Sequence, residues 1–422
     1  MFKTHDVRGL LNTQINQGTF YTLGRATARV FRYEATTGRD YRTGHRVLES
    51  AFLAGFESEG GQVSTILGNV PTSVISEEND GLGLCFTASH NPAGYCGVKF
   101  FIKNRYCTQN DIIRLKEEYD KLGGQETIRV PAYRLIEPSM NSKETIWDYC
   151  EKLPPFQNAI YDLAGGAACA LEFLFNKKIF YSPDPDFKHH SPEPMDSTLT
   201  DLKKKTINSK SLGFAFDGDA DRVIAVDNGK TIEGHILLIE LAKQNLSPND
   251  KVVLSIDCPT EAFEKLEDEG FKPSWAPVGD INVIQKALEC GAKIAGERSG
   301  HYSFLPDYPY SDGLRAASIA SNSMKVGQLT KLSEEFKNIC LIESVFVRAD
   351  FNKIQNYLNE QKNIQEIITI DGIKATFDNF SILIRQSNTE PKIRINAEST
   401  SLNDSQYAIN LAKTAIEVSK IN

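Results

Sequence analysis

A short apolar run that ends in three closely spaced carboxylates constrains the fold more than any other stretch of the chain. Residues 212–216 are apolar enough to form a buried strand, and Asp217, Asp219 and Asp221 follow at its carboxyl end, with Arg222 directly after them. Like charges so close together repel one another unless a positive group lies among them. Oxygen ligands of this kind favour a hard divalent cation, although a solvated acidic turn explains the same pattern equally well.

A calcium loop of the EF-hand type also begins with alternating acidic residues. Such a loop requires Gly at its sixth position and Glu at its twelfth, whereas this chain has Arg222 and Asn228 at those positions. The calcium interpretation is therefore excluded, and Mg²⁺ is the cation that the pattern favours.

The length of the chain indicates several domains. At 422 residues it is too long for one ordinary hydrophobic core, so we expect three or four domains. Its hydrophobic content of 41% and charged content of 24% are typical of a soluble globular protein. The net charge of −8 provides no basic surface for nucleic acid or an anionic membrane. A small anionic substrate is still compatible with local clusters of Arg and Lys.

The cysteines and the N-terminus indicate a cytoplasmic protein. The eight cysteines include no CxxC pair, which argues against a zinc ribbon or a disulfide framework and suits a reducing cytosol. The first residues lack the apolar core of a signal peptide. No run approaches the ~20 apolar residues that a membrane span requires.

The first part of the chain, residues 1–140, alternates helical and strand patterns, which predicts an α/β domain. Helices are predicted at residues 21–33, 46–57 and 109–122, a short buried strand at 82–86, and a loop at 38–42.

A second α/β domain is predicted for residues 141–245. It contains a proline-rich loop at residues 182–192. His189 and His190 in this loop could indicate a metal site, but adjacent histidines without spaced partner residues are more often solvated, and we expect them to be solvated. Residues 222–232 form a hairpin pattern around an Asn-Gly pair, which favours a type I′ turn.

A third α/β domain, residues 246–340, is predicted to begin with a strand at 252–256. Thr260 is expected to cap the helix that follows, and a second helix is expected at 282–290. Residues 341–422 are predicted to form a smaller α+β domain, with strands at 343–349, 373–377, 380–386 and 392–398 and a helix at 404–419.

Ser89 lies in a tight polar loop after the predicted strand at 82–86, with His90 beside it and Lys99 ten residues further on. A hydroxyl in this position could act as a nucleophile or carry a phosphoryl group. Taken alone, the loop is better explained by Ser89 capping a following helix.

Two further polar loops carry potential ligand-binding groups. Residues 385–391 form a turn between two predicted strands, and their guanidinium, hydroxyl, amide and backbone N–H groups suit a bound phosphate. Residues 297–301 offer donors and acceptors suited to sugar hydroxyls. Each loop is also compatible with an ordinary structural turn.

Together these loops resemble the α-D-phosphohexomutase superfamily, which includes phosphoglucomutases, phosphomannomutases and phosphoglucosamine mutases. The resemblance covers nearly the whole chain. Its motifs, in order, are FKTHDVRG at 2–9, GRDYR at 38–42, TASHNP at 87–92, GVKF at 97–100, DGDADR at 217–222, GERSGH at 296–301 and RQSNTEP at 385–391.

The resemblance implies a heart-shaped enzyme with four domains, each of which supplies one loop to a central active site. It implies that Ser89 is the phosphoserine and that a phosphoserine oxygen joins Asp217, Asp219 and Asp221 around one Mg²⁺ ion. The remaining implied roles concern catalysis by Arg8, Lys99, Arg222 and His90, and substrate binding by Glu297, Ser299, His301, Arg385, Ser387, Asn388 and Thr389. A hexose bisphosphate is the implied intermediate and activator.

The chain departs from the family pattern at several positions. His5 replaces a usual Tyr, and Asp257 and Asp280 occupy regions where some relatives have a lysine and a histidine. Proton transfer is therefore expected to rely on Lys99, Arg8 or water. Arg298 replaces the usual Met or Gln of the sugar loop, where it either favours a more anionic or differently hydroxylated substrate or points into solvent.

The expected function is that of a phosphomannomutase/phosphoglucomutase, an isomerase that moves phosphate between the 1- and 6-positions of a hexose. The segment 308–313 favours this branch of the family. The alternatives are a phosphoglucosamine mutase, a non-catalytic phosphosugar-binding relative, or a phosphatase, whose activity a closed site would suppress. The expected partners are small phosphosugars, with no nucleic acid or membrane, and the expected state is a monomer or a homodimer.

Overall fold

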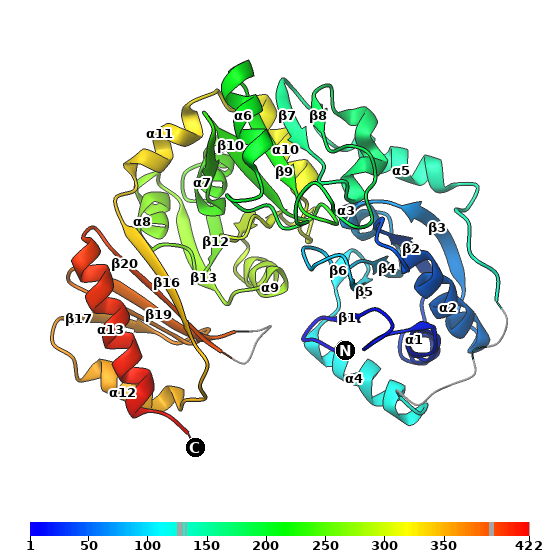
Figure 1. Ribbon diagram of the computed structural model, residues 1–422, viewed down its shortest axis with the longest axis horizontal. Helices are drawn as coiled ribbons and strands as arrows, with labels where there is room; N and C mark the ends of the chain where they lie inside the picture. Colours follow the sequence, from blue (N-terminus) through cyan, green and yellow to red (C-terminus); the bar gives the residue numbers. More distant parts are fainter. Residues whose placement is uncertain (125–129, 131–132, 388–391, 422) are drawn as a thin grey trace. The chain divides into compact units, whose positions relative to one another are not determined.

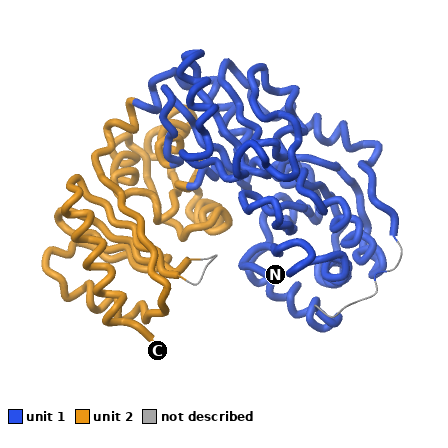
Figure 2. The backbone as a smooth tube through the Cα atoms, viewed as in Figure 1, with its two compact units in different colours: residues 1–234, 299–330 blue, residues 235–298, 331–422 orange. Residues whose placement is uncertain are grey.

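A computed structural model describes residues 1–124, 130, 133–387 and 392–421 of the chain. The chain divides into two compact units, which are described separately (Figure 2). The first unit contains residues 1–234 and 299–330, and the second contains residues 235–298 and 331–422. No helix in the described part of the chain is long and apolar enough to cross a membrane.

The first unit begins with a six-stranded mixed sheet in the order β1-β5-β4-β2-β3, with β6 paired to β5. Strand β2 runs parallel to β3 and β4, whereas β5 is antiparallel to both β1 and β4. Its strands are β1 (Asp6–Leu10), β2 (Ala35–Arg39), β3 (Val63–Asn69), β4 (Leu82–Phe86), β5 (Tyr95–Ile102) and β6 (Arg105–Tyr106). The accompanying helices are α1 (Gln17–Val30), α2 (His45–Ser58), α3 (Thr72–Glu77), α4 (Gln109–Lys121) and α5 (Ser142–Glu151).

The core of this sheet is built largely from aromatic side chains. Phe52 from α2 packs edge-on against Phe86 at the end of β4, with ring centroids 5.4 Å apart, and both rings are fully buried. Rings in this geometry contribute about 0.5–1.5 kcal/mol beyond the area they bury. The packing therefore fixes the end of β4, from which the Ser89 loop departs.

A second, five-stranded sheet of the same unit has the order β11-β10-β9-β7-β8. Its strands are β7 (Ala159–Asp162), β8 (Lys178–Ile179), β9 (Leu212–Phe216), β10 (Val223–Asp227) and β11 (Lys230–Ile232). The same unit also contains the 3₁₀ helix η1 (Ala167–Leu174), α6 (Thr200–Ser209), β15 (Tyr302–Phe304), which does not belong to this sheet, and α10 (Gly313–Ser323). Strand β9 is buried throughout, as its apolar sequence predicts, and β10 and β11 form the predicted Asn-Gly hairpin.

The second unit contains three parallel strands, with β12 between β13 and β14. These strands are β12 (Lys251–Ser255), β13 (Lys272–Ala276) and β14 (Ile294–Gly296). The helices of this region are α7 (Gly234–Asn245), whose first residue belongs to the first unit, α8 (Thr260–Asp268), α9 (Asp280–Cys290) and α11 (Gln328–Glu335), which crosses the boundary between the units.

The second unit ends in a five-stranded antiparallel sheet in the order β16-β20-β19-β18-β17. Its elements are β16 (Ile339–Val345), α12 (Phe351–Asn359), β17 (Ile364–Ile368), β18 (Ile373–Phe377), β19 (Ser381–Gln386), β20 (Ile393–Ser399) and α13 (Leu402–Val418). Helices α12 and α13 pack on one face of the sheet (Figure 1). The sequence predicted strands at β18, β19 and β20 closely, but it missed β17 and α12.

The expected cap of α8 is wrong. The N-cap residue of this helix is Pro259, and no side chain caps the helix. Thr260 is instead the first residue of the helix. The hydroxyl of Thr260 instead donates to Glu398 of β20 at 2.9 Å, and its backbone N–H donates to the same carboxylate. A carboxylate distant in sequence thus takes the place of the local cap, which local sequence patterns do not reveal.

Candidate functional site

The three aspartates lie together at the carboxyl end of β9 in the first unit. Asp217, Asp219 and Asp221 are fully buried, and each offers one oxygen within 4.8 Å of the others. Burial raises the pKa of Asp217 well above its usual range, and the neighbouring charges of Asp221 and Asp219 add to this effect. The cluster is therefore not the solvated acidic turn that the sequence left open.

Lys99 of β5 compensates part of this charge. Its Nζ donates to Oδ2 of Asp219 at 2.8 Å and also to Oδ2 of Asp221. Burial alone would raise the pKa of Asp221, but Lys99, His301 and Arg222 outweigh burial and hold this pKa well below its usual range. The two oxygen atoms bound by Lys99 come from two of the three acids, so the cluster is paired with a cation from the neighbouring sheet.

The start of α3 also contacts the acidic loop. The hydroxyl of Thr72 donates to Oδ2 of Asp219 at 2.7 Å, and its backbone N–H donates to the backbone oxygen of the same residue at 3.0 Å. These two contacts fix both the backbone and the side chain of Asp219.

Ser89 contacts the acidic cluster directly. Its hydroxyl donates to Oδ2 of Asp217 at 2.8 Å, and the side chain is buried. The residue adopts a left-handed backbone conformation, with φ of 51°, which is uncommon for a residue with a side chain. A Cβ atom at Gly218 would lie 2.5 Å from the backbone oxygen of Ser89, so glycine permits this close approach of the two loops. No helix follows Ser89, since the next element is β5, and the capping explanation is excluded.

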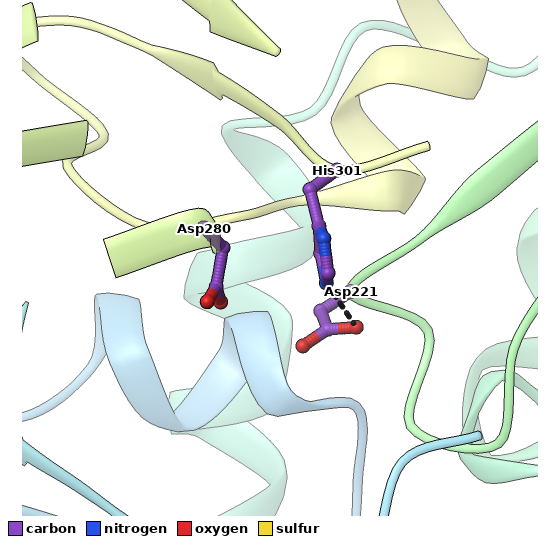
Figure 3. Close-up of side chains that lie close together, drawn as sticks. All are labelled: Asp221, Asp280 and His301. Carbon is purple, nitrogen blue, oxygen red and sulfur yellow. Dashed lines mark ion pairs between the residues drawn. The ribbon is translucent and has the colours of Figure 1, made fainter. Parts of the chain in front are cut away.

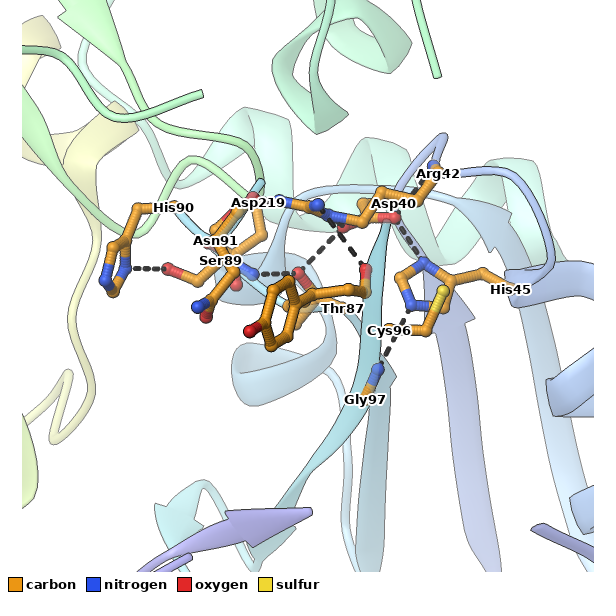
Figure 4. Close-up of polar contacts among 12 residues, drawn as sticks. Asp40, Arg42, His45, Thr87, Ser89, His90, Asn91, Cys96, Gly97 and Asp219 are labelled. Atoms are coloured by element: carbon orange, nitrogen blue, oxygen red, sulfur yellow. Dashed lines mark hydrogen bonds and ion pairs between the residues drawn. The ribbon is translucent and has the colours of Figure 1, made fainter. Parts of the chain in front are cut away.

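A buried network of charged side chains, including Asp40 and Arg42, holds the Ser89 loop in place (Figure 4). Arg42 donates to the backbone oxygens of Ser89, Asn91 and, at 2.7 Å, Pro92. Asp40 accepts from Nε of Arg42 at 3.1 Å and from the hydroxyl of Thr87 at 2.9 Å, and the same hydroxyl accepts the N–H of Ser89 at 2.9 Å. The backbone conformation of Ser89 is thus held on both sides.

The charges of this network support one another. Burial alone would raise the pKa of Asp40, but His45 and Arg42 outweigh burial and lower it. Burial opposes protonation of His45, yet Asp40 raises the pKa of this histidine to about 9. The sequence treated residues 38–42 as a loop, whereas Gly38 and Arg39 end β2. The supporting role of Asp40 and Arg42 was missed, because only the three-dimensional contacts reveal it.

Arg222 and His301 lie beside the acidic cluster in the first unit. Arg222 donates from Nε to Nε2 of His301 at 3.2 Å, and this Nε2 lies 3.4 Å from Oδ1 of Asp221 (Figure 3). Oγ of Ser299 lies 3.2 Å from Nδ1 of His301. Through these contacts, Ser299 and His301 of the predicted sugar-binding loop lie beside the loop that carries the three aspartates.

His90 and Arg8 complete this group. Nδ1 of His90 lies 3.2 Å from Oγ of Ser89, and Arg8 donates to Oδ1 of Asn91 at 2.9 Å. The nearby Arg222 guanidinium, followed by burial and the charges of Arg8 and His301, holds the pKa of His90 far below its usual range. His90 is therefore neutral, and the charges that lower its pKa form a local environment suited to an anion.

The proline-rich loop of the second predicted domain lies against this site. Phe187 packs its ring under the guanidinium of Arg42, with the ring centroid 4.9 Å away, and Oε1 of Glu193 lies 3.9 Å from Nη1 of Arg222. The prediction of a solvated pair of histidines is correct for His189 and wrong for His190. The side chain of His190 is only 6% exposed and lies 3.2 Å from both carboxylate oxygens of Asp162.

The second unit holds the other predicted site residues. Oε1 of Glu297, which is buried, accepts the backbone N–H of Gly279 at 2.7 Å. Arg385 is buried at the end of β19, and the backbone N–H of Ser387 donates to the oxygen of Lys392 at 2.9 Å. Asn388 and Thr389 lie outside the described residues.

Three of the residues that differ from the family pattern, Asp257, Asp280 and Arg298, also lie in the second unit. Burial and the charge of Glu297 raise the pKa of Asp257, against the opposing effects of Ser255, Arg385 and Arg298. Arg298 is half-buried and lines a small cavity together with Asp257, so it does not simply point into solvent. Asp280 begins α9.

The three aspartates fit a magnesium ion. Oδ1 of Asp219 is buried and has no hydrogen-bond partner among the described residues. Hard oxygen ligands with residual negative charge are those that Mg²⁺ prefers. Asp217, Asp219 and Asp221 could hold the ion, and the hydroxyl oxygen of Ser89 is placed beside them.

Four family domains match the chain in sequence order. Residues 1–122, 172–230 and 233–340 match the family domains described as "Phosphoglucomutase/phosphomannomutase, alpha/beta/alpha domain" I, II and III, and residues 341–405 match the C-terminal domain of the same family. The predicted fold class, three α/β domains followed by a smaller α+β domain, is confirmed. The predicted domain boundaries stay predictions.

Curated relatives resemble the chain over nearly its full length. A phosphoglucosamine mutase from Clostridioides difficile is 27% identical, over 94% of this chain and 94% of its own length. A phosphoglucosamine mutase from Acetivibrio thermocellus is 29% identical, over 100% of this chain and 98% of its own length.

A solved structure shares the fold. The crystal structure of a phosphoglucomutase/phosphomannomutase family protein from Burkholderia thailandensis has a TM-score of 0.83 at 23% identity, and the match covers 99% of this chain and 96% of that chain.

Proposed function

Because the chain belongs to the α-D-phosphohexomutase superfamily, as a four-domain protein of the phosphoglucomutase/phosphomannomutase type, we propose that it moves a phosphoryl group between the 1- and 6-positions of a hexose phosphate. Ser89 carries the phosphoryl group in this proposal, and a hexose bisphosphate is the intermediate and activator. The observation that carries the proposal is the contact between the hydroxyl of Ser89 and Oδ2 of Asp217 at 2.8 Å, beside two further buried aspartates and Lys99.

The proposed cycle contains two phosphoryl transfers. In the first, the P–O bond to Ser89 breaks and a P–O bond to the free sugar hydroxyl forms, while the sugar hydroxyl loses a proton and the serine oxygen gains one. In the second, after the bisphosphate has turned over, the Ser89 hydroxyl loses its proton and takes the phosphoryl group from the other sugar position. That sugar oxygen gains a proton, so the net reaction is an isomerisation that consumes no water.

Phosphoryl transfer depends mainly on positioning and on neutralisation of charge. Lys99, Arg222 and Arg8 are proposed to neutralise the phosphoryl group on Ser89. Neutral His90, 3.2 Å from the serine oxygen, can share a hydrogen bond with it without adding charge. When bound at the three aspartates, Mg²⁺ supplies further charge neutralisation at the phosphoryl oxygens.

The second unit is proposed to bind the rest of the substrate. Glu297, with Ser299 and His301 of the first unit, is assigned to the sugar, and Arg385, Ser387, Asn388 and Thr389 are assigned to the phosphate that does not react. Arg385 supports this assignment because its guanidinium is buried and its Nη2 has no hydrogen-bond partner among the described residues. An arginine in this state is suited to a dianion.

For the sugar, we propose glucosamine phosphate as the first substrate to test, ahead of the glucose and mannose phosphates that the sequence favoured. The full-length relatives named above are phosphoglucosamine mutases. The segment 308–313, which favoured the other branch, is engaged in internal contacts: Arg315 lies over the ring of Tyr308, and Asp312 caps α10 and accepts from the hydroxyl of Tyr149. These contacts explain the segment without a substrate.

The compartment and the oligomeric state remain proposals. All eight cysteines are free thiols, which supports the proposed cytoplasmic location. A monomer or a homodimer is proposed.

The test is a coupled mutase assay with glucosamine, mannose and glucose phosphates, with Mg²⁺ and a trace of the matching bisphosphate. Intact-mass measurement of the same sample should show one phosphoryl group. The Ser89→Ala variant is the matched control and should lose both the mass increment and at least about 10³-fold in turnover. Normal turnover by this variant, or sugar binding without turnover by the phosphorylated wild type, would overturn the proposal.

A further inference from the structure

The environment of Arg385 assigns a role to a residue that the sequence did not single out. Nε of Arg385 donates to Oδ2 of Asp371 at 3.2 Å, and the two side chains are 7% and 20% exposed. We infer that Asp371 is a positioning residue for phosphate binding, which orients Arg385 and links it to the segment that holds Glu297. This inference rests on the proposed function, because it assigns Arg385 to the phosphate of the substrate.

The backbone places Asp371 against Arg385. Asp371 and Gly372 are the last two residues of the connection between β17 and β18, and β18 pairs with β19, so that Ile373 lies opposite Ile384. Gly372 has φ of 78°, and a Cβ atom there would lie 2.2 Å from the backbone oxygen of Ile384 and 2.8 Å from Cα of Arg385. Only glycine permits so close a contact, and the turn therefore holds the Asp371 carboxylate beside the guanidinium.

The same carboxylate oxygen has a second partner. Oδ2 of Asp371 also accepts the backbone N–H of Val278 at 3.0 Å. The next residue, Gly279, donates its N–H to Oε1 of Glu297 at 2.7 Å. The successive N–H groups of Val278 and Gly279 thus bind the carboxylates of Asp371 and Glu297. Asp371 holds Arg385, the proposed phosphate ligand, and Glu297 is the proposed sugar ligand.

This arrangement leaves one side of the guanidinium available. Asp371 binds Nε, whereas Nη2 of Arg385 is buried without a hydrogen-bond partner in the described ranges. A phosphate is bound best by two parallel N–H groups of a guanidinium whose orientation is fixed in advance. Asp371 supplies that orientation without contacting the phosphate itself. Its removal should weaken phosphosugar binding only through Arg385.

A double-mutant cycle tests this prediction. The cycle compares four full-length proteins: one with Asp371→Ala, one with Arg385→Ala, one with both changes and one with neither. All four also carry Ser89→Ala, so that bound sugar phosphate does not turn over. Calorimetric titration with glucosamine 6-phosphate and with glucose 6-phosphate measures Kd. The matched control is Asp378→Asn, which changes another carboxylate of the same sheet that accepts from Gln365 at 2.9 Å.

The expected result is that Asp371→Ala raises Kd about tenfold when Arg385 is present, which corresponds to about 1.4 kcal/mol, and less than twofold when Arg385 is absent. Asp378→Asn should leave Kd unchanged. Equal losses in both backgrounds, or no loss in either, would overturn the inference. In the active protein, Asp371→Ala should raise KM more than it lowers kcat, which a general loss of folding would not produce.

The two proposals fail in different ways. Wild-type protein that binds sugar phosphates without turnover would overturn the proposed mutase activity, and the cycle would still measure the coupling between Asp371 and Arg385. If the protein is an active mutase but the effects of Asp371→Ala and Arg385→Ala on binding free energy are additive, the proposed function stands and the inference about Asp371 is overturned.

Discussion

Arg42 donates to the backbone oxygen of Ser89, a residue 47 positions away, and thereby holds the loop that carries the proposed nucleophile. The same guanidinium binds the backbone oxygens of Asn91 and Pro92 and the carboxylate of Asp40. One fully buried cation thus fixes three peptide groups of one loop.

Arg42→Lys should impair transfer without changing the metal site. A lysine cannot satisfy these separate acceptors in one plane, so the left-handed conformation of Ser89 should relax. A displacement of about 1 Å typically costs about 10²-fold in rate, and we expect a loss of that order in kcat. Steady-state kinetics measure it, and Mg²⁺ titration should give an unchanged Kd. The control is Arg46→Lys, which changes a nearby arginine in the first turn of α2 whose side chain is 42% exposed, and this variant should retain full activity.

Asp219→Asn should weaken Mg²⁺ binding. The buried carboxylate accepts from Lys99 and Thr72 through one oxygen, and its other oxygen has no hydrogen-bond partner within the described residues. Loss of its charge removes a hard ligand, and we expect at least about tenfold weaker metal binding and about 10²-fold lower kcat. Calorimetric titration with Mg²⁺ measures the first effect. Asp307→Asn changes an exposed carboxylate and should alter neither value. Unchanged Mg²⁺ affinity in Asp219→Asn would remove this residue from the metal site.

Lys99→Met should make the protein dependent on Mg²⁺ for stability. Lys99 is the lysine that pairs with Asp219 and Asp221, and its removal leaves buried carboxylates with less compensation. Breaking such a pair typically costs about 3–5 kcal/mol. The melting temperature should fall in the absence of Mg²⁺ and recover more on addition of Mg²⁺ than that of the wild type. A variant whose melting temperature responds to Mg²⁺ no more than the wild type would contradict this account.

His190→Gln should change the pH dependence of stability. Burial alone would lower the pKa of His190, but the hydrogen-bonded carboxylate of Asp162 outweighs it and raises the pKa above 6.5. The stabilisation is therefore fully present below pH 6.5 and is lost as the pH rises through the pKa of the folded protein.

Thermal denaturation from about pH 6 to about pH 8.5 measures this effect. The melting temperature of the wild type should decrease over this range by roughly 2–4 °C more than that of His190→Gln. His189→Gln, which changes the exposed neighbouring histidine, should follow the wild type. Parallel curves for the wild type and His190→Gln would contradict the raised pKa.

The sequence predicted those parts of the site that lie within one continuous segment. The buried strand β9 with its three acids, the Asn-Gly hairpin and the strand before Ser89 are local patterns of polarity and turn residues, and the structure has each of them. The family resemblance also predicted three α/β domains followed by a smaller C-terminal domain, and four family domains match the chain in that order.

Contacts between distant segments could not be predicted in this way. The contacts of Arg42 with the Ser89 loop, the buried partner of His190, and the contact of Asp371 with Arg385 all depend on groups that the fold brings together. Strand β17 was missed because its sequence shows no clear alternation of polar and apolar residues. Helix α12 was missed although Phe351, Ile354 and Leu358 recur at helical spacing and Asp350 caps the helix.

The contact between Thr72 and Asp219 joins segments separated by 147 residues, and it has a consequence for synthesis of the chain. Domains generally fold in order as the chain leaves the ribosome. The first sheet, with Lys99 on β5, and helix α3, which begins at Thr72, are complete before the acidic turn emerges, so they can act as a template that receives the turn in its final conformation. A nascent chain that does not yet include Asp217 would leave Lys99 without its acidic partners. We expect this partly synthesised state to be the one most susceptible to chaperone binding and proteolysis.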